Sequence, residues 1–102
     1  MTYKDKVAAI TKQFRRAVEK KHNIIEMKLF GSFARGDYSK TSDIDLMVRL
    51  PKVDRNIEED LFDIAYDLEL EHDCVIDVIV LPQDIGNNIM IYRNIQKEGL
   101  AI

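Results

Sequence analysis

The stretch that decides the fold runs from Leu29 to Val48 and reads Leu-Phe-Gly-Ser-Phe-Ala-Arg-Gly-Asp-Tyr-Ser-Lys-Thr-Ser-Asp-Ile-Asp-Leu-Met-Val. An apolar run ends at a Gly-Ser pair, a polar segment follows, and a second apolar run carries Asp43 and Asp45. Side chains two residues apart in a β-strand project from the same face, so these two carboxylates should point together. Their mutual repulsion destabilises a strand, and a divalent cation would remove that cost. The pattern therefore predicts a metal site.

A third acid lies in another apolar run. The segment Cys74 to Leu81 reads Cys-Val-Ile-Asp-Val-Ile-Val-Leu and predicts a strand that is apolar on both faces apart from Asp77. We expect this carboxylate to be buried, which is costly unless it is paired or bound to metal. If the strand lies beside the one that bears the other two acids, the three carboxylates suit Mg²⁺, which prefers oxygen ligands. A buried salt bridge from Asp77 to Arg49 or Lys28 is the alternative.

Gly31 and Ser32 supply the complementary half of a phosphate site. A glycine after a strand lets the backbone approach a ligand, and a helical turn over residues 32 to 36 would point free N–H groups at an anion. The Ser32 hydroxyl can add a hydrogen bond, and Arg35 can steady phosphate charge. An ordinary strand-to-helix turn with a surface arginine is the alternative. A P-loop is excluded because Asp37 stands where that motif requires lysine.

The remaining periodicity predicts helices and strands in a simple order. We expect an α/β (α+β) fold in which a small mixed β-sheet has helices packed on one face. Thr2 and Asn56 are the expected N-caps of the first two long helices, and Ile91, Tyr92 and Ile95 are expected to face inward from the last one. The predicted elements are a helix over 3–21, strands over 24–30 and 43–50, a helix from 56 to about 72, a strand over 74–81 and a helix over 86–98.

Composition narrows the class of protein. A chain of 102 residues with 46% hydrophobic and 32% charged residues predicts a single domain over 1–102. The net charge of −3 gives no overall basic footprint for nucleic acid. The apolar runs are far shorter than the roughly 20 residues of a membrane span. One cysteine, Cys74, cannot form an internal disulfide, which fits a cytoplasmic location.

These residues carry a resemblance to a known family. Gly31-Ser32, ten intervening residues, Asp43-Ile44-Asp45 and then a strand with Asp77 resemble the signature of the DNA polymerase β-like nucleotidyltransferase superfamily. The segments Ala34-Arg35-Gly36 and Ser42 to Leu46 are similar to sequences of the minimal nucleotidyltransferase (MNT) branch. That branch includes antitoxins of HEPN/MNT toxin–antitoxin pairs. The resemblance covers nearly the whole chain.

The resemblance implies a reaction and a site. Members transfer a nucleoside monophosphate from a nucleoside triphosphate to a hydroxyl and release pyrophosphate. By resemblance, Gly31 and Ser32 hold the triphosphate of ATP. Asp43, Asp45 and Asp77 hold two Mg²⁺ ions, which clamp the attacking and leaving oxygens. Asp77 is implied to bind the metal that lowers the pKa of the acceptor hydroxyl, or to act as the base.

The resemblance also implies a partner. Minimal members act beside a HEPN-domain ribonuclease, which they inactivate by adding AMP to a tyrosine, and a HEPN-type partner would supply surface that this short chain lacks. Nucleotidyl transfer to a small molecule is one alternative. A non-catalytic toxin-binding module is another, although pure binding would not need the Gly-Ser pair and three acids. Direct binding of nucleic acid or membrane is not expected, and the sequence leaves a homo-oligomer open.

Overall fold

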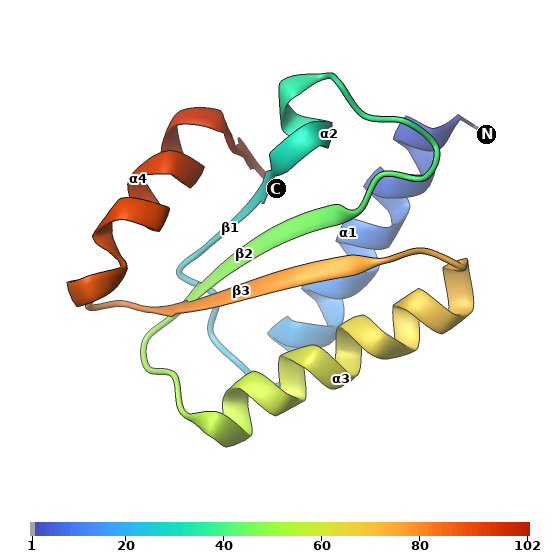
Figure 1. Ribbon diagram of the computed structural model, residues 1–102. Coiled ribbons are helices and arrows are strands. Elements are labelled where there is room, and N and C mark those ends of the chain that lie inside the picture. Colours follow the sequence, from blue (N-terminus) through green and yellow to red (C-terminus); the bar gives the residue numbers. More distant parts are fainter. Residues whose placement is uncertain (1) are drawn as a thin grey trace.

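The predicted small mixed sheet is present in the computed structural model, which describes residues 2–102. The four strands lie in the order β3-β2-β1-β4 (Figure 1). The elements follow along the chain as α1 (Tyr3–Glu19), β1 (Glu26–Phe30), α2 (Gly31–Arg35), β2 (Ile44–Leu50), α3 (Arg55–His72), β3 (Ile76–Pro82), the 3-10 helix η1 (Gly86–Asn88), α4 (Ile89–Glu98) and β4 (Leu100–Ala101).

Strand directions in the sheet place the start of β2 next to the start of β3. β1 runs antiparallel to both β2 and β4, whereas β2 and β3 are parallel. A parallel pair requires a crossover, and α3 provides it. The short strand β4 was not predicted, because two residues are too few to show an alternating pattern. The sheet therefore ends in β3 on one side and β4 on the other.

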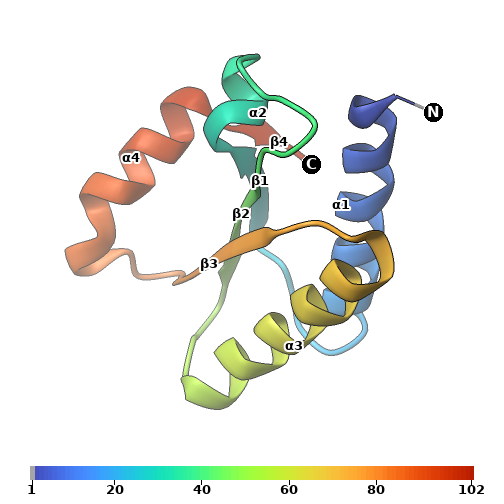
Figure 2. The same cartoon turned by 45° about the vertical axis from the view of Figure 1, so that its right-hand side comes forward.

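Helices cover both faces of the sheet. Figures 1 and 2 show α1 and α3 on one face, where they enclose the main core around Phe14, Leu46 and Leu61. α4 lies on the opposite face, where Ile95 packs with Met47 of β2 and with β3. The prediction that the helices pack on one face of the sheet is thus confirmed for α1 and α3. It is wrong for α4, which packs on the opposite face. β2 is buried on both faces and supplies apolar side chains to both layers, with Leu46 and Val48 in the main core and Met47 against α4.

The helix N-termini are capped as the local sequence allows. Thr2 caps α1 as predicted, in a capping box with Asp5. The predicted cap of α3 was wrong: Asp54, and not Asn56, accepts a hydrogen bond from the backbone N–H of Ile57 at 2.9 Å. A carboxylate at this position also interacts favourably with the positive end of the helix dipole. α3 therefore begins at Arg55, one residue before the predicted cap.

Polar contacts fix the orientation of α4. The Tyr92 hydroxyl donates to the Glu26 carboxylate at 2.6 Å, and Arg49 forms an ion pair with the same carboxylate at 3.5 Å. The side of α4 that contacts the sheet is therefore the side that carries Tyr92 and the buried Ile95. Ile91 lies at its edge and is 39% exposed, so its predicted inward position is wrong. Over residues 2–102, no helix is long and apolar enough to cross a membrane.

Candidate active site

The parallel pairing of β2 and β3 brings the predicted acids together. Asp45 lies directly opposite Asp77 in the register, so the two side chains project from the same face about 4.8 Å apart in the pairing direction. Asp43 comes immediately before β2, where the Ile44 N–H donates to the carbonyl of Val75 at 2.9 Å. This hydrogen bond extends the β2–β3 pairing to the start of the strand. All three predicted carboxylates therefore lie at one end of the sheet.

The pKa values show that these carboxylates interact. Burial and the nearby charges of Asp77 and Asp43 raise the pKa of Asp45 to about 6. The pKa of Asp77 is also raised, first by desolvation and then by the charge of Asp43. Like charges that raise each other's pKa favour binding of a proton or a cation between them. The cluster is therefore prepared to accept positive charge.

Asp77 itself is exposed, which corrects the prediction of a buried carboxylate. β3 is the outermost strand of the sheet, so a side chain near its start stays in contact with water. The alternative of a salt bridge is also wrong within residues 2–102. Arg49 pairs with Glu26, and Lys28 lies on β1, with β2 between it and β3.

The three carboxylates suit Mg²⁺ by their chemistry, although they do not form a closed ligand set. Within residues 2–102, no three Asp, Glu, His or Cys side chains are grouped closely enough to hold one metal ion by themselves. Mg²⁺ in proteins usually keeps several waters and takes one or two carboxylates together with substrate phosphates. The open oxygen-donor set of Asp43, Asp45 and Asp77 fits that manner of binding.

Gly31 places the Gly-Ser turn directly against the acids. Its φ of +74° favours glycine, and a Cβ built on it would lie 2.1 Å from Oδ2 of Asp45. The contact follows from strand pairing, because Phe30 is opposite Asp45 in the β1–β2 register. α2 begins at Gly31 and places the half-buried Ser32 in its first turn. The two predicted motifs therefore form one continuous site.

Arg35 lies at the rim of this site. Its guanidinium pairs with Asp37 and with Glu98 of α4, each at 3.4 Å. Its positive charge also lowers the pKa of Asp45, against the larger effects of burial and of the other two acids. Arg35 is therefore close enough to influence the cluster electrostatically, while its hydrogen-bonding groups are engaged by acids of the loop and of α4.

Sequence reasoning missed an aromatic cluster beside the acids. The rings of Phe33 and Tyr38 stack with centroids 4.6 Å apart, and Tyr3 packs against both. The Tyr3 hydroxyl donates to the carbonyl of Ser42 at 2.7 Å, one residue before Asp43. The available signal was the aromatic residues around the Gly-Ser turn, but their link to residue 3 is a long-range contact. α1 therefore holds the loop that ends at Asp43.

Replacing Tyr3 by phenylalanine should weaken this link without emptying the aromatic cluster. Loss of one hydrogen bond should cost about 1 kcal/mol of unfolding free energy. We also expect Mg²⁺ to bind several-fold more weakly, because Asp43 would be held less firmly. The measurement is the rise in melting temperature with increasing Mg²⁺ concentration, with Thr11→Val, which removes a hydroxyl hydrogen bond on α1 away from the acids, as the control. An unchanged Mg²⁺ dependence would show that Tyr3 acts only on stability.

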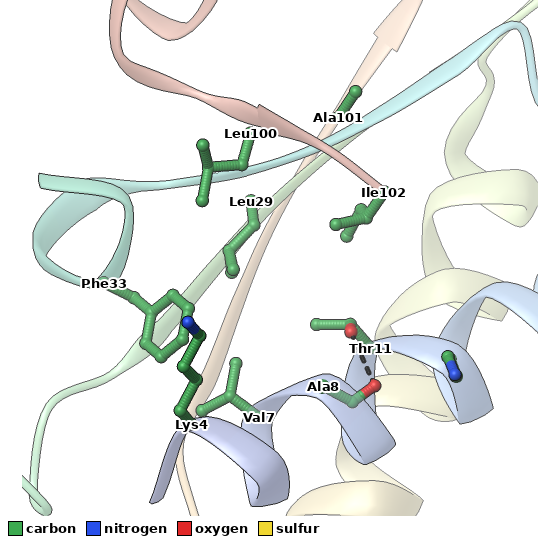
Figure 3. Close-up of a pocket in the computed structure, with 10 residues that line it drawn as sticks. Lys4, Val7, Ala8, Thr11, Leu29, Phe33, Leu100, Ala101 and Ile102 are labelled. Carbon is green, nitrogen blue, oxygen red and sulfur yellow. Dashed lines mark hydrogen bonds between the residues drawn. The ribbon is translucent and has the colours of Figure 1, made fainter. Parts of the chain in front are cut away.

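A separate apolar cavity does not belong to the acid cluster. Its volume is about 340 Å³, and it lies between α1, α2, β1 and β4. Figure 3 shows Phe33, Leu29 and Ile102 pointing into it above α1, where Thr11 bonds to the Ala8 carbonyl. None of the predicted site residues lines it. The candidate active site is therefore the acid cluster at the N-terminal ends of β2 and β3, and not this cavity.

The chain is similar to known proteins in sequence and in fold. Residues 11–102 match the family described as a nucleotidyltransferase domain. The chain belongs to this nucleotidyltransferase family. A curated protein of Methanocaldococcus jannaschii, named "putative protein adenylyltransferase", is 36% identical over 96 residues, which cover 89% of this chain and 92% of that protein. The predicted family resemblance and the predicted enzyme class, a nucleotidyltransferase, are confirmed.

Solved structures share the fold. A toxin–antitoxin structure with AMP-PNP superposes with a TM-score of 0.69 at 21% identity, covering 93% of this chain and 70% of that one. A complex of a tri-AMPylated HEPN toxin with an MNT antitoxin from Shewanella oneidensis gives a TM-score of 0.64 at 19% identity, covering 98% and 71%. A structure described as a "putative minimal nucleotidyltransferase" gives a TM-score of 0.64 at 18% identity, covering 94% of this chain and 95% of that one. The predicted nucleotidyltransferase-like fold is confirmed by these likenesses.

Proposed function

We propose that this nucleotidyltransferase transfers AMP from ATP to a tyrosine hydroxyl of a HEPN-type partner protein and thereby acts as an antitoxin. The observation that carries the chemistry is the convergence of Asp43, Asp45 and Asp77 beside Gly31. The relative from M. jannaschii, named "putative protein adenylyltransferase", supports a protein as the acceptor. The AMPylated HEPN toxin in the S. oneidensis complex supports the partner class.

The two parts of the site would bind different groups, the triphosphate of ATP and Mg²⁺. Gly31 and Ser32 would bind the triphosphate where α2 begins, because Gly31 allows the phosphates close to the backbone. Asp43, Asp45 and Asp77 would hold Mg²⁺. The bound metal would neutralise phosphate charge and lower the pKa of a coordinated hydroxyl. Without a bound cation, the negative charges of the three carboxylates would also repel ATP.

The exposure of Asp77 favours a protruding acceptor over an enclosed small molecule. Small-molecule sites are usually concave and bury most of their ligand, whereas Asp77 lies at the open edge of the sheet. A tyrosine oxygen would form a bond to the α-phosphorus, the bond to the β-phosphate oxygen would break, and pyrophosphate would leave. The phenol has an ordinary pKa near 10, and Asp77 would hold or receive its proton.

Labelled ATP tests this function directly. With the HEPN-type partner co-purified, α-labelled ATP should label the partner and γ-labelled ATP should not, because pyrophosphate is the leaving group. Mass spectrometry should then find AMP on a tyrosine of the partner. Transfer of the γ-label would indicate a kinase and contradict the proposal. An unmodified partner together with an AMP-tagged small molecule would instead support small-molecule nucleotidyl transfer.

A further inference from the structure

The outer side of α3 carries a row of exposed apolar side chains. Phe62, Tyr66 and Leu70 are 45%, 58% and 67% exposed. Residues four apart lie on the same side of a helix, so the three form a continuous row. Val75, just before β3, is also half exposed. We call these four residues the α3 surface. An exposed apolar area of this kind is typical of an interaction site.

The α3 surface extends to the edge strand that bears Asp77 of the candidate active site. A groove of about 480 Å³ runs between α3 and β3, and its lining includes Phe62, Tyr66 and Asp77. The Glu69 carboxylate accepts a hydrogen bond from the Ile76 N–H at 2.9 Å, which ties the two walls together. β3 is the outermost strand, so the groove is open to solvent. A molecule that covers the α3 surface would reach the edge of the sheet at β3, from which the Asp77 side chain projects to the other face, together with that of Asp45.

Acidic side chains beside the apolar row of α3 restrict which molecules can bind there. Glu59, Asp63 and Asp67 follow the same four-residue spacing along α3. The helix carries seven Asp or Glu residues and one Arg, Arg55. Such a surface repels nucleic acid and anionic membranes, and it disfavours a second copy of itself because the acidic rows would meet. It complements apolar side chains flanked by Lys or Arg.

We propose that the α3 surface is the docking site for the protein that accepts AMP, and that the docking segment of that protein presents apolar side chains flanked by Lys or Arg. This inference rests on the proposed function, because it requires a protein acceptor. An acceptor docked on α3 would reach the Asp77 carboxylate around the open edge of β3. The apolar row supplies the contact area, and the acidic row selects a basic partner over an acidic one.

Binding can be tested without catalysis. The probes are a synthetic amphipathic helix of Leu and Lys and its counterpart with Glu in place of every Lys. We expect the Lys peptide to shift amide signals of α3 and β3 in the ¹⁵N-labelled protein, and to bind at least about tenfold more tightly than the Glu peptide. The double variant Tyr66→Ser/Leu70→Ser should weaken binding about tenfold. The matched control, Ile89→Ser/Met90→Ser, changes exposed apolar residues of α4 and should leave binding unchanged.

Several outcomes would overturn the docking site. Equal affinity for the two peptides, shifts centred on α1 and β4, or equal loss in both double variants would each contradict it. A concentration-dependent dimer that Tyr66→Ser/Leu70→Ser abolishes would assign the surface to a second copy of the chain. Label transfer to the partner, measured with the same variants, separates the two proposals. If transfer persists at an unchanged KM for the partner in the α3 variant, the docking site is wrong while the proposed function stands.

Discussion

Asp45→Asn is expected to reduce nucleotidyl transfer by about 100-fold or more while the domain stays folded. Loss of a group that only supports a metal ligand already costs roughly 10–100-fold in many sites, and Asp45 is placed at the centre of the cluster, opposite Asp77 and beside Gly31. Asparagine has the same shape as aspartate but no charge. The variant therefore tests the charge of the site without opening a cavity.

The same variant should change stability in the opposite direction. The pKa of Asp45 is raised to about 6 in the folded protein from 3.8, so the folded state binds more protons than the unfolded state between these values. The contribution of Asp45 to the unfolding free energy therefore falls as the pH rises from about 4 to 6. Asp45→Asn removes this loss of unfolding free energy with rising pH. In metal-free buffer at pH 7, we expect the variant to be at least as stable as the natural protein.

Two measurements check this prediction. Denaturant unfolding in the presence of a chelator, repeated from pH 4 to 7, gives the stability profile, and transfer of the α-label gives activity. Asp84→Asn, in the exposed segment after β3, is the control that removes one negative charge away from the cluster. If Asp45→Asn unfolds the domain, Asp45 has a structural role and the site must be reassigned. Full activity would equally exclude it as a metal ligand.

Local patterns were sufficient to predict most of the fold. The apolar runs that end at Gly31 and begin at Asp43 gave strands close to the observed bounds, and the helical spacing of α1 and α3 fixed the main core. The placement of β3 beside β2 was a condition of the predicted site and was not itself predicted, because local patterns do not show which strands pair. Once that condition is met, the register aligns Asp45 with Asp77 and the site follows.

The features that escaped prediction depend on long-range contacts. Asp77 was expected to be buried because its neighbours are apolar, but the position of β3 at the sheet edge exposes it. The side of the sheet on which α4 packs is set by contacts of Tyr92 with Glu26, 66 residues earlier in the chain. The hydrogen bond from Tyr3 to Ser42 spans 39 residues. None of these pairings leaves a local periodic signal.

Gly31→Ala is expected to abolish binding of Mg²⁺ and ATP, whereas Gly36→Ala should preserve it. Both glycines have positive φ angles, +74° and +83°, so alanine at either position should cost roughly 1–2 kcal/mol of unfolding free energy through backbone strain. Their surroundings differ. A Cβ at position 31 would lie 2.1 Å from the Asp45 carboxylate, while within residues 2–102 no atom beyond the two adjacent residues lies within 4 Å of one at position 36. Only the first substitution must displace Asp45 or the start of α2.

Thermal unfolding with and without Mg²⁺ and ATP separates strain from loss of the site. At about 100 times its dissociation constant, a ligand should raise the unfolding free energy of the natural protein and of Gly36→Ala by about 2.7 kcal/mol. Gly31→Ala should show the lower starting stability and no gain, because its Cβ displaces the Asp45 carboxylate from the cluster. An equal gain in both alanine variants would mean that the contact between Gly31 and Asp45 is not part of the nucleotide site. Absence of any gain in the natural protein would exclude the site itself.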